Sequence, residues 1–63
     1  MIDHREYLRT ALHTHTGRAM VRRCGIQPCT MDLDDHAAWP DGRCREIAER
    51  VLEQLQRAYP ILF

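Results

Sequence analysis

The sequence contains no lysine, no asparagine and no serine, and it has no long hydrophobic run. All 9 basic residues are therefore arginine, and they balance 9 acidic residues to a formal net charge of zero with neutral histidines. A membrane-spanning helix needs about 20 consecutive apolar residues, and a signal peptide needs an apolar core near its start. Neither is present, so we expect a cytoplasmic protein that does not bind a membrane.

The length of 63 residues indicates a single small domain, residues 1–63. A chain of about 60 residues buries only about 60% of the surface that it exposes when unfolded. Such a core stabilises weakly, so domains of this size commonly need a metal, disulfides or a partner chain as well. The length therefore predicts some additional staple.

The hydrophobic pattern predicts a helix near each end of the chain. Apolar residues recur at helical spacing over about 2–14, where Asp3 is placed to cap the N-terminus and Gly17 follows as a stop signal. An apolar stripe at i, i+3, i+4 and i+7 predicts a second helix over about 43–59, with Asp41 as its N-cap. Its polar face places Glu46 and Glu53 four residues before an arginine, as expected for ion pairs along a helix.

The middle segment, residues 15–42, shows no helical period. Ala19-Met20-Val21 favours a short strand, and the glycines and prolines predict turns. An irregular segment of this length is unusual in so small a domain and needs something to hold it. The predicted fold is therefore small and mainly α: two helices flanking an irregular, metal-stapled middle segment with a short strand or hairpin, as in zinc fingers.

Cysteine and histidine supply the candidate staple. Cys24 and Cys29 flank a Gly/Pro turn, and Cys44 lies in the first turn of the second predicted helix. Structural zinc binds four N or S ligands in a tetrahedron, and three cysteines with one histidine are a standard set. The predicted zinc ligands are His15, Cys24, Cys29 and Cys44, with His36 and then His13 as alternatives to His15.

Two other interpretations of the cysteines remain open. Free cysteines behave as small hydrophobic residues, so all three can be ordinary packing residues, with Cys44 on the apolar stripe of its helix. Cys24 and Cys29 can also form a disulfide, although an odd third cysteine and the expected cytoplasmic location argue against it.

The order of these residues resembles that in a group of short, uncharacterised actinobacterial and actinophage proteins. Those proteins typically have a histidine, a cysteine pair, and then Trp-Pro and a cysteine that opens a helix. The matching positions here are His15, Cys24, Cys29, Trp39-Pro40 and Cys44, within about residues 15–55. The resemblance implies a small zinc-binding module and implies no particular activity.

These observations favour a non-enzymatic, zinc-stabilised module that binds another protein, such as a phage or mobile-element factor acting on a host protein. The acidic helix face and the apolar C-terminal residues suggest how it binds. A homodimer is a further expectation from the apolar end of the chain, formed by Tyr59, Ile61, Leu62 and Phe63.

The alternative is a zinc-finger-like protein that binds nucleic acid. Residues 1–30 carry a net charge of +3 and residues 31–63 a net charge of −3. A chain with no net charge lacks the summed positive field typical of nucleic-acid binding, but a local cluster of arginines can still contact phosphates. The candidate contacts are Arg18, Arg22, Arg23 and Arg43.

Overall fold

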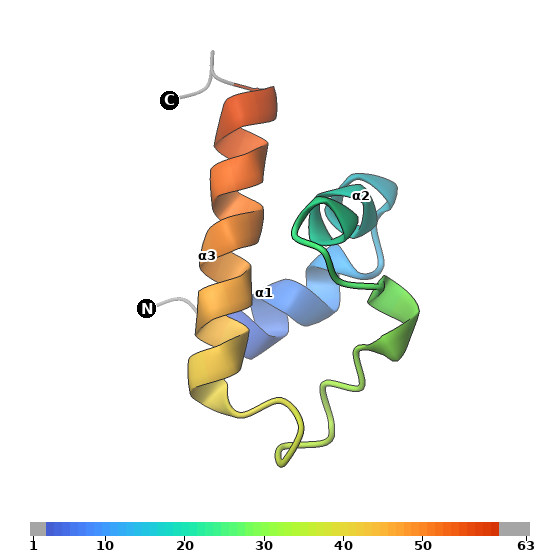
Figure 1. Cartoon of the computed structure of the whole chain (residues 1–63), viewed down its shortest axis with the longest axis vertical. Coiled ribbons are helices and arrows are strands. Elements are labelled where there is room, and N and C mark those ends of the chain that lie inside the picture. The colour runs from blue at the N-terminus through green and yellow to red at the C-terminus, as the bar shows by residue number, and fades with distance from the viewer. Residues whose placement is uncertain (1–2, 60–63) are drawn as a thin grey trace.

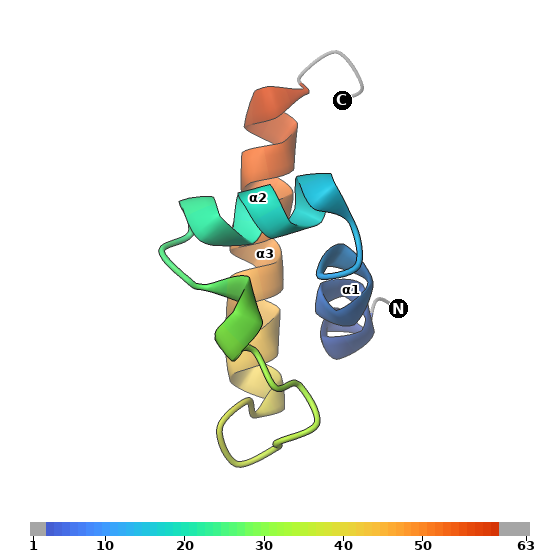
Figure 2. The same cartoon turned by 90° about the vertical axis from the view of Figure 1, so that its right-hand side faces the viewer.

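Three α-helices and one short 3₁₀ helix make up the computed structural model, which describes residues 3–59 (Figure 1). The elements in chain order are α1 (His4–Ala11), α2 (His15–Arg23), the 3₁₀ helix η1 (Pro28–Thr30) and α3 (Asp41–Ala58). The long helix α3 contacts both shorter helices, which lie on the same side of it (Figure 1). Seen from that side, α2 crosses in front of α3 and α1 lies beside the crossing (Figure 2).

The predicted strand is wrong, and so is the zinc-finger-like, metal-stapled fold. Residues 3–59 contain no strand, and Ala19-Met20-Val21 lies inside α2. In that helix Gly17, Met20 and Val21 are buried at i, i+3 and i+4, which is one helical face. The mainly helical class is right, but the residues predicted to be an irregular segment contain a third α-helix.

The first predicted helix, over about 2–14, corresponds to α1 and ends earlier than predicted. Its N-terminus is confirmed, because the Asp3 carboxylate accepts hydrogen bonds from the backbone N–H groups of Arg5 and Glu6. Helix α1 ends at Ala11, however, and after three connecting residues α2 begins at His15, with Thr14 as its N-cap. Gly17 therefore lies in the first turn of α2 rather than after a helix end.

The second predicted helix is confirmed as α3, with a different start. Pro40 occupies the N-cap position, and Asp41 lies in the first turn, where its charge suits the helix dipole. Cys44, Ile47, Ala48 and Val51 form its buried stripe. In the part of the chain that the structure describes, no helix is long and apolar enough to cross a membrane.

The hydrophobic core lies where α1 and α2 meet α3, and the segment before α3 also contributes to it. Its buried residues are Leu8, Met20, Val21, Met31, Leu33, Trp39, Cys44, Ile47, Ala48 and Val51. Three of them, Met31, Leu33 and Trp39, come from the connection between η1 and α3. This connection is therefore irregular in backbone but fixed by side chains buried in the core.

Candidate functional site

The predicted zinc ligands lie in different parts of the fold. His15 is exposed at the first residue of α2, whereas Cys24 is half-buried at the C-cap of the same helix. Cys29 is exposed in η1. Cys44 is fully buried in the first turn of α3, where its thiol donates a hydrogen bond to the carbonyl oxygen of Trp39 at 3.6 Å. All three cysteines are free thiols.

Helix α2 itself keeps the predicted ligands apart. His15 and Cys24 are the first residue and the C-cap of the nine-residue helix α2, so the helix separates them by a rise of about 13 Å at 1.5 Å per residue. Ligands of one zinc lie only about 2.0–2.3 Å from the metal. The alternatives His13 and His36 are exposed. Within residues 3–59, no three histidine, cysteine, aspartate or glutamate side chains are close enough together to hold a metal ion.

Arg5 joins α1 to the connection that precedes α3. Its guanidinium donates hydrogen bonds to the carbonyl oxygens of Leu33 and Trp39, each at 2.7 Å, and to the carboxylate of Asp41 at 2.8 Å. Only 10% of the Arg5 side chain is exposed. One side chain thus fastens three points in the sequence between residues 33 and 41, and we call this set of contacts the Arg5 clasp.

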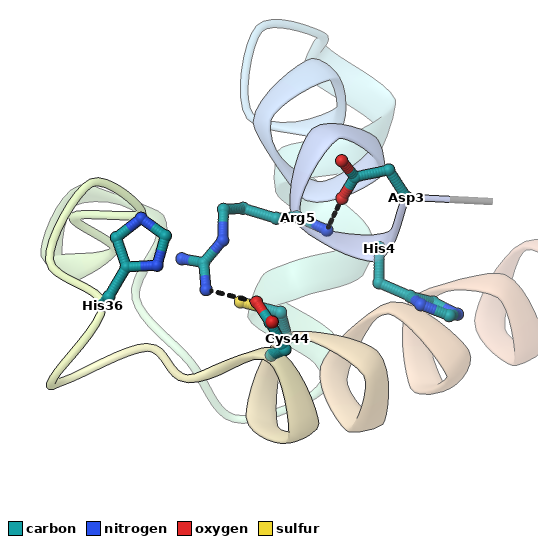
Figure 3. Close-up of a pocket in the computed structure, with 6 residues that line it drawn as sticks. Asp3, His4, Arg5, His36 and Cys44 are labelled. Carbon is teal, nitrogen blue, oxygen red and sulfur yellow. Dashed lines mark hydrogen bonds and ion pairs between the residues drawn. The ribbon is translucent and has the colours of Figure 1, made fainter.

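A cavity of about 390 Å³ opens beside the Arg5 clasp, lined by Asp3, His4, Arg5, His36, Asp41 and Cys44 (Figure 3). The imidazole of His36 lies next to the Arg5 guanidinium, whereas His4 points away from it (Figure 3). The hydrogen bond from Arg5 lowers the pKa of the Asp41 carboxyl and keeps it ionised. The guanidinium already donates to two carbonyl groups and this carboxylate, so the cavity surrounds a structural contact.

Sequence reasoning missed Arg5 completely. The sequence shows Arg5 only as one of the charges near the N-terminus, because a single arginine in a helix does not indicate which groups its guanidinium contacts. Its partners lie 28 and 34 residues away in the sequence, and two of the three are backbone oxygens. No residue pattern records such a contact.

Ion pairs divide the nine arginines into two groups. Five of them pair with acids of the described residues: Arg5, Arg9, Arg45, Arg50 and Arg57. The predicted pairs along α3 are confirmed, with Arg50 at 3.3 Å from Glu46 and Arg57 at 2.8 Å from Glu53. The acidic face of α3 is therefore largely neutralised by its own arginines.

The remaining arginines are those of the nucleic-acid alternative. Arg18, Arg22 and Arg23 are exposed on α2, and we call them the α2 arginine surface. Between Glu6 and Asp32 the sequence has no acidic residue, and within residues 3–59 no carboxylate forms an ion pair with any of the three. A chain of zero net charge thus carries one helix whose exposed charges are all positive.

Local interactions fix where α2 begins. The Thr14 hydroxyl donates to the carbonyl of Ala11 at 3.0 Å and accepts from the N–H of Gly17 at 2.9 Å, so it joins the end of α1 to the start of α2. A Cβ atom on Gly17 would lie 2.3 Å from the Ala11 oxygen, so this close contact requires glycine.

The C-terminus of α2 is closed by a Schellman motif. Gly25 has a φ of 83°, a conformation that suits glycine. The Gly25 N–H donates to the carbonyl oxygen of Arg22 at 2.9 Å, and the Ile26 N–H donates to the carbonyl oxygen of Val21 at 3.4 Å. Both ends of the helix are therefore defined, and the α2 arginine surface is held on a fixed element.

Arg43 extends the positive charge to α3. Its guanidinium lies over the ring of the buried Trp39, 4.5 Å from the ring centroid. A shallow groove of about 450 Å³ has Arg43, Glu46, Ile47 and Arg50 on α3 along one side and Ile26, which follows α2, on the other. Arg43 thus lies on the side of α3 that faces the end of α2.

Comparisons with protein-family models, curated proteins and solved structures gave no match. The resemblance to short actinobacterial and actinophage proteins therefore stays a prediction. The predicted homodimer surface falls mostly on Ile61, Leu62 and Phe63, which lie outside the described residues, while Tyr59 is 50% exposed. The function has to be argued from the geometry of this chain.

Proposed function

We propose that this protein binds nucleic acid through the α2 arginine surface. The observation that carries the proposal is the contrast between α2 and the rest of the molecule. Five arginines are paired with acids, whereas Arg18, Arg22 and Arg23 are exposed on one helix without an acidic partner among residues 3–59. Arginine binds phosphate with two parallel hydrogen bonds, which suits it to nucleic-acid backbones.

The zero net charge of the chain is a weaker argument against nucleic-acid binding once the positions of the charges in the fold are known. Counterion release depends on the phosphates that the protein actually contacts, and the acids of this chain lie outside the segment that forms α2. Arg22 and Arg23 also lie in the last turn of α2, where the helix dipole favours positive charge. The helix dipole therefore favours two of the three charges of the α2 arginine surface.

The same ion pairs weaken the prediction of a protein partner bound by the acidic face of α3. Each of its three glutamates, Glu46, Glu49 and Glu53, lies within 3.3 Å of an arginine four residues away. A partner would have to compete with those arginines, whereas the α2 arginine surface is free of such competition from the described residues.

Salt dependence of binding tests the proposal. We expect a fluorescently labelled 20-base-pair DNA to bind at low salt and to bind more weakly as salt rises. A plot of the logarithm of the binding constant against the logarithm of the salt concentration should have a slope of about −0.9 for each phosphate contacted. Replacing Arg22 with glutamine (Arg22→Gln) should reduce that slope by about 1. The matched control is Arg57→Gln, which removes the same charge from an arginine that is paired with Glu53.

Circular dichroism of both variants checks that the helices are intact. Equal slopes for Arg22→Gln and Arg57→Gln would show that charge anywhere on the surface suffices, and would contradict the role of α2. No binding to DNA or RNA at low salt would overturn the function itself.

A further inference from the structure

We infer that the nucleic acid is duplex DNA and that α2 lies in its major groove; this rests on the proposed function and names its target. The major groove of B-DNA is about 12 Å wide and admits an α-helix, while the minor groove, at about 6 Å, does not. Helix α2 crosses in front of α3, and no other helix of residues 3–59 lies in front of it (Figure 2). The α2 arginine surface is exposed, so a long, rigid ligand can reach it.

The arrangement of α1 and α2 fits this mode of binding. Three residues, Leu12 to Thr14, connect the two helices, and α3 packs against both. In a helix-turn-helix unit, two helices joined by a turn of three or four residues present the second helix to the major groove. The Thr14 hydroxyl and the close approach of Gly17 to Ala11 fix this turn, so the direction of α2 relative to α1 is set.

The exposed face of α2 has the chemistry to read base edges as well as phosphates. His15, Arg18 and Arg22 are exposed at i, i+3 and i+7, opposite the buried Gly17, Met20 and Val21. The N-terminal part of such a helix contacts bases, which assigns base contacts to His15 and Arg18. The other two members of the α2 arginine surface, Arg22 and Arg23, then contact phosphates.

The positions of the aromatic residues argue against a single strand. Proteins that bind single strands stack the bases on exposed aromatic rings. Helix α2 contains no Phe, Tyr or Trp, Trp39 is buried and Tyr7 is half-buried. The exposed Tyr59 lies at the C-cap of α3 and not on α2. A duplex of RNA does not fit this mode of binding, because its major groove is deep and too narrow to admit side chains. Among these ligands, duplex DNA matches a bare positive helix best.

Competition for labelled duplex DNA separates this inference from the proposed function. The competitors are the same 20-base-pair DNA, one of its strands alone, and the RNA duplex of the same sequence, all at one salt concentration. We expect the DNA duplex to compete at least about tenfold better than the other two. Equal competition by the single strand or the RNA duplex would overturn the inference, while the salt slopes of Arg22→Gln and Arg57→Gln would still report on the function.

Selection from a pool of random duplexes tests the base contacts. The wild-type protein should enrich a short sequence that contains guanine, because arginine reads the O6 and N7 atoms of guanine with two hydrogen bonds. Arg18→Lys keeps the charge but loses that paired geometry, so it should keep the salt slope and lose at least about tenfold of the preference for the enriched sequence. Failure to enrich any sequence, or enrichment that Arg18→Lys leaves unchanged, would overturn the assignment of base contacts.

Discussion

At the scale of single residues, Arg5 does what the sequence led us to expect of a metal. It fixes two backbone carbonyls and one carboxylate from the connection before α3, and those groups would otherwise have to be satisfied by water. Nearly all of its side chain is removed from solvent, while the guanidinium keeps its charge because Asp41 raises its pKa. A single arginine thus links α1 to three points of the chain between Leu33 and Asp41.

We predict that Arg5→Met lowers the melting temperature much more than Arg9→Met does. Both changes remove one charge from α1, but Arg9 is 38% exposed and its hydrogen bond reaches only one acid, Asp34. Loss of Arg5 removes the guanidinium donor from the Leu33 and Trp39 carbonyls and leaves Trp39 only its weak bond from the Cys44 thiol. Unpaired polar groups are costly when partly buried. Thermal unfolding followed by circular dichroism measures the difference. Equal melting temperatures for the two variants would show that the clasp contributes nothing beyond surface charge.

At the scale of elements, the junction between α1 and α2 depends on one glycine. A Cβ on Gly17 would meet the Ala11 carbonyl oxygen at 2.3 Å and the Thr14 hydroxyl at 2.6 Å. Gly17→Ala should therefore force the two helices apart and cost about 1–3 kcal/mol, as overpacking does. The matched control is Gly42→Ala in the first turn of α3, where a Cβ meets nothing within 4 Å.

Gly42→Ala should stabilise the protein by about 0.5–1 kcal/mol, because alanine is the better helix former. Urea denaturation of the two variants measures both changes in the free energy of unfolding, the expected loss for Gly17→Ala and the expected gain for Gly42→Ala. A Gly17→Ala variant that gains as much stability as Gly42→Ala would contradict the close junction, and with it the fixed direction of α2 on which base reading depends.

The contrast between α3 and α2 shows what the sequence could and could not predict. Helix α3 has an apolar stripe long enough to be recognised from spacing alone, and it was predicted to within two residues at each end. Helix α2 has nine residues, and only three of them are buried. Its glycine and its β-branched Val21 favour a turn and a strand by local preference, which the contacts with α1 and α3 override.

At the scale of the whole molecule, the Cys/His pattern predicted the wrong fold because spacing along the chain does not give distance in space. The sequence suggested that His15 and Cys24 come together across an irregular segment, but α2 holds them at its opposite ends. Cys44 was also placed correctly in the first turn of a helix, yet its side chain belongs to the core beside Leu8 and Trp39. The arginines of α2 were predictable as a candidate surface, whereas their lack of acidic partners required the fold.

The two possible staples, a metal site and the Arg5 clasp, predict different responses of the whole protein to acid. The carboxyl pKa values of Asp41 and Asp34 are lowered by hydrogen bonds from Arg5 and Arg9. A lowered pKa in the folded state stabilises the fold above the unfolded value of about 3.9, and this contribution is lost as pH falls through the folded value. The contribution of the Arg5–Asp41 contact is therefore constant between pH 7 and 5 and begins to fall below about pH 4.

Zinc held by cysteine and histidine would dissociate at higher pH, as histidine takes up protons near its usual pKa of about 6.5. We therefore predict that the free energy of unfolding falls through loss of these ion pairs only below about pH 4, and that Asp41→Asn reduces this acid-dependent loss. A chelator at pH 7 should leave the melting temperature unchanged. Urea denaturation from pH 7 to 3, with and without chelator, measures all three. A transition near pH 6 that the chelator reproduces at pH 7 would contradict the clasp and restore the metal, because no carboxylate paired with arginine titrates there.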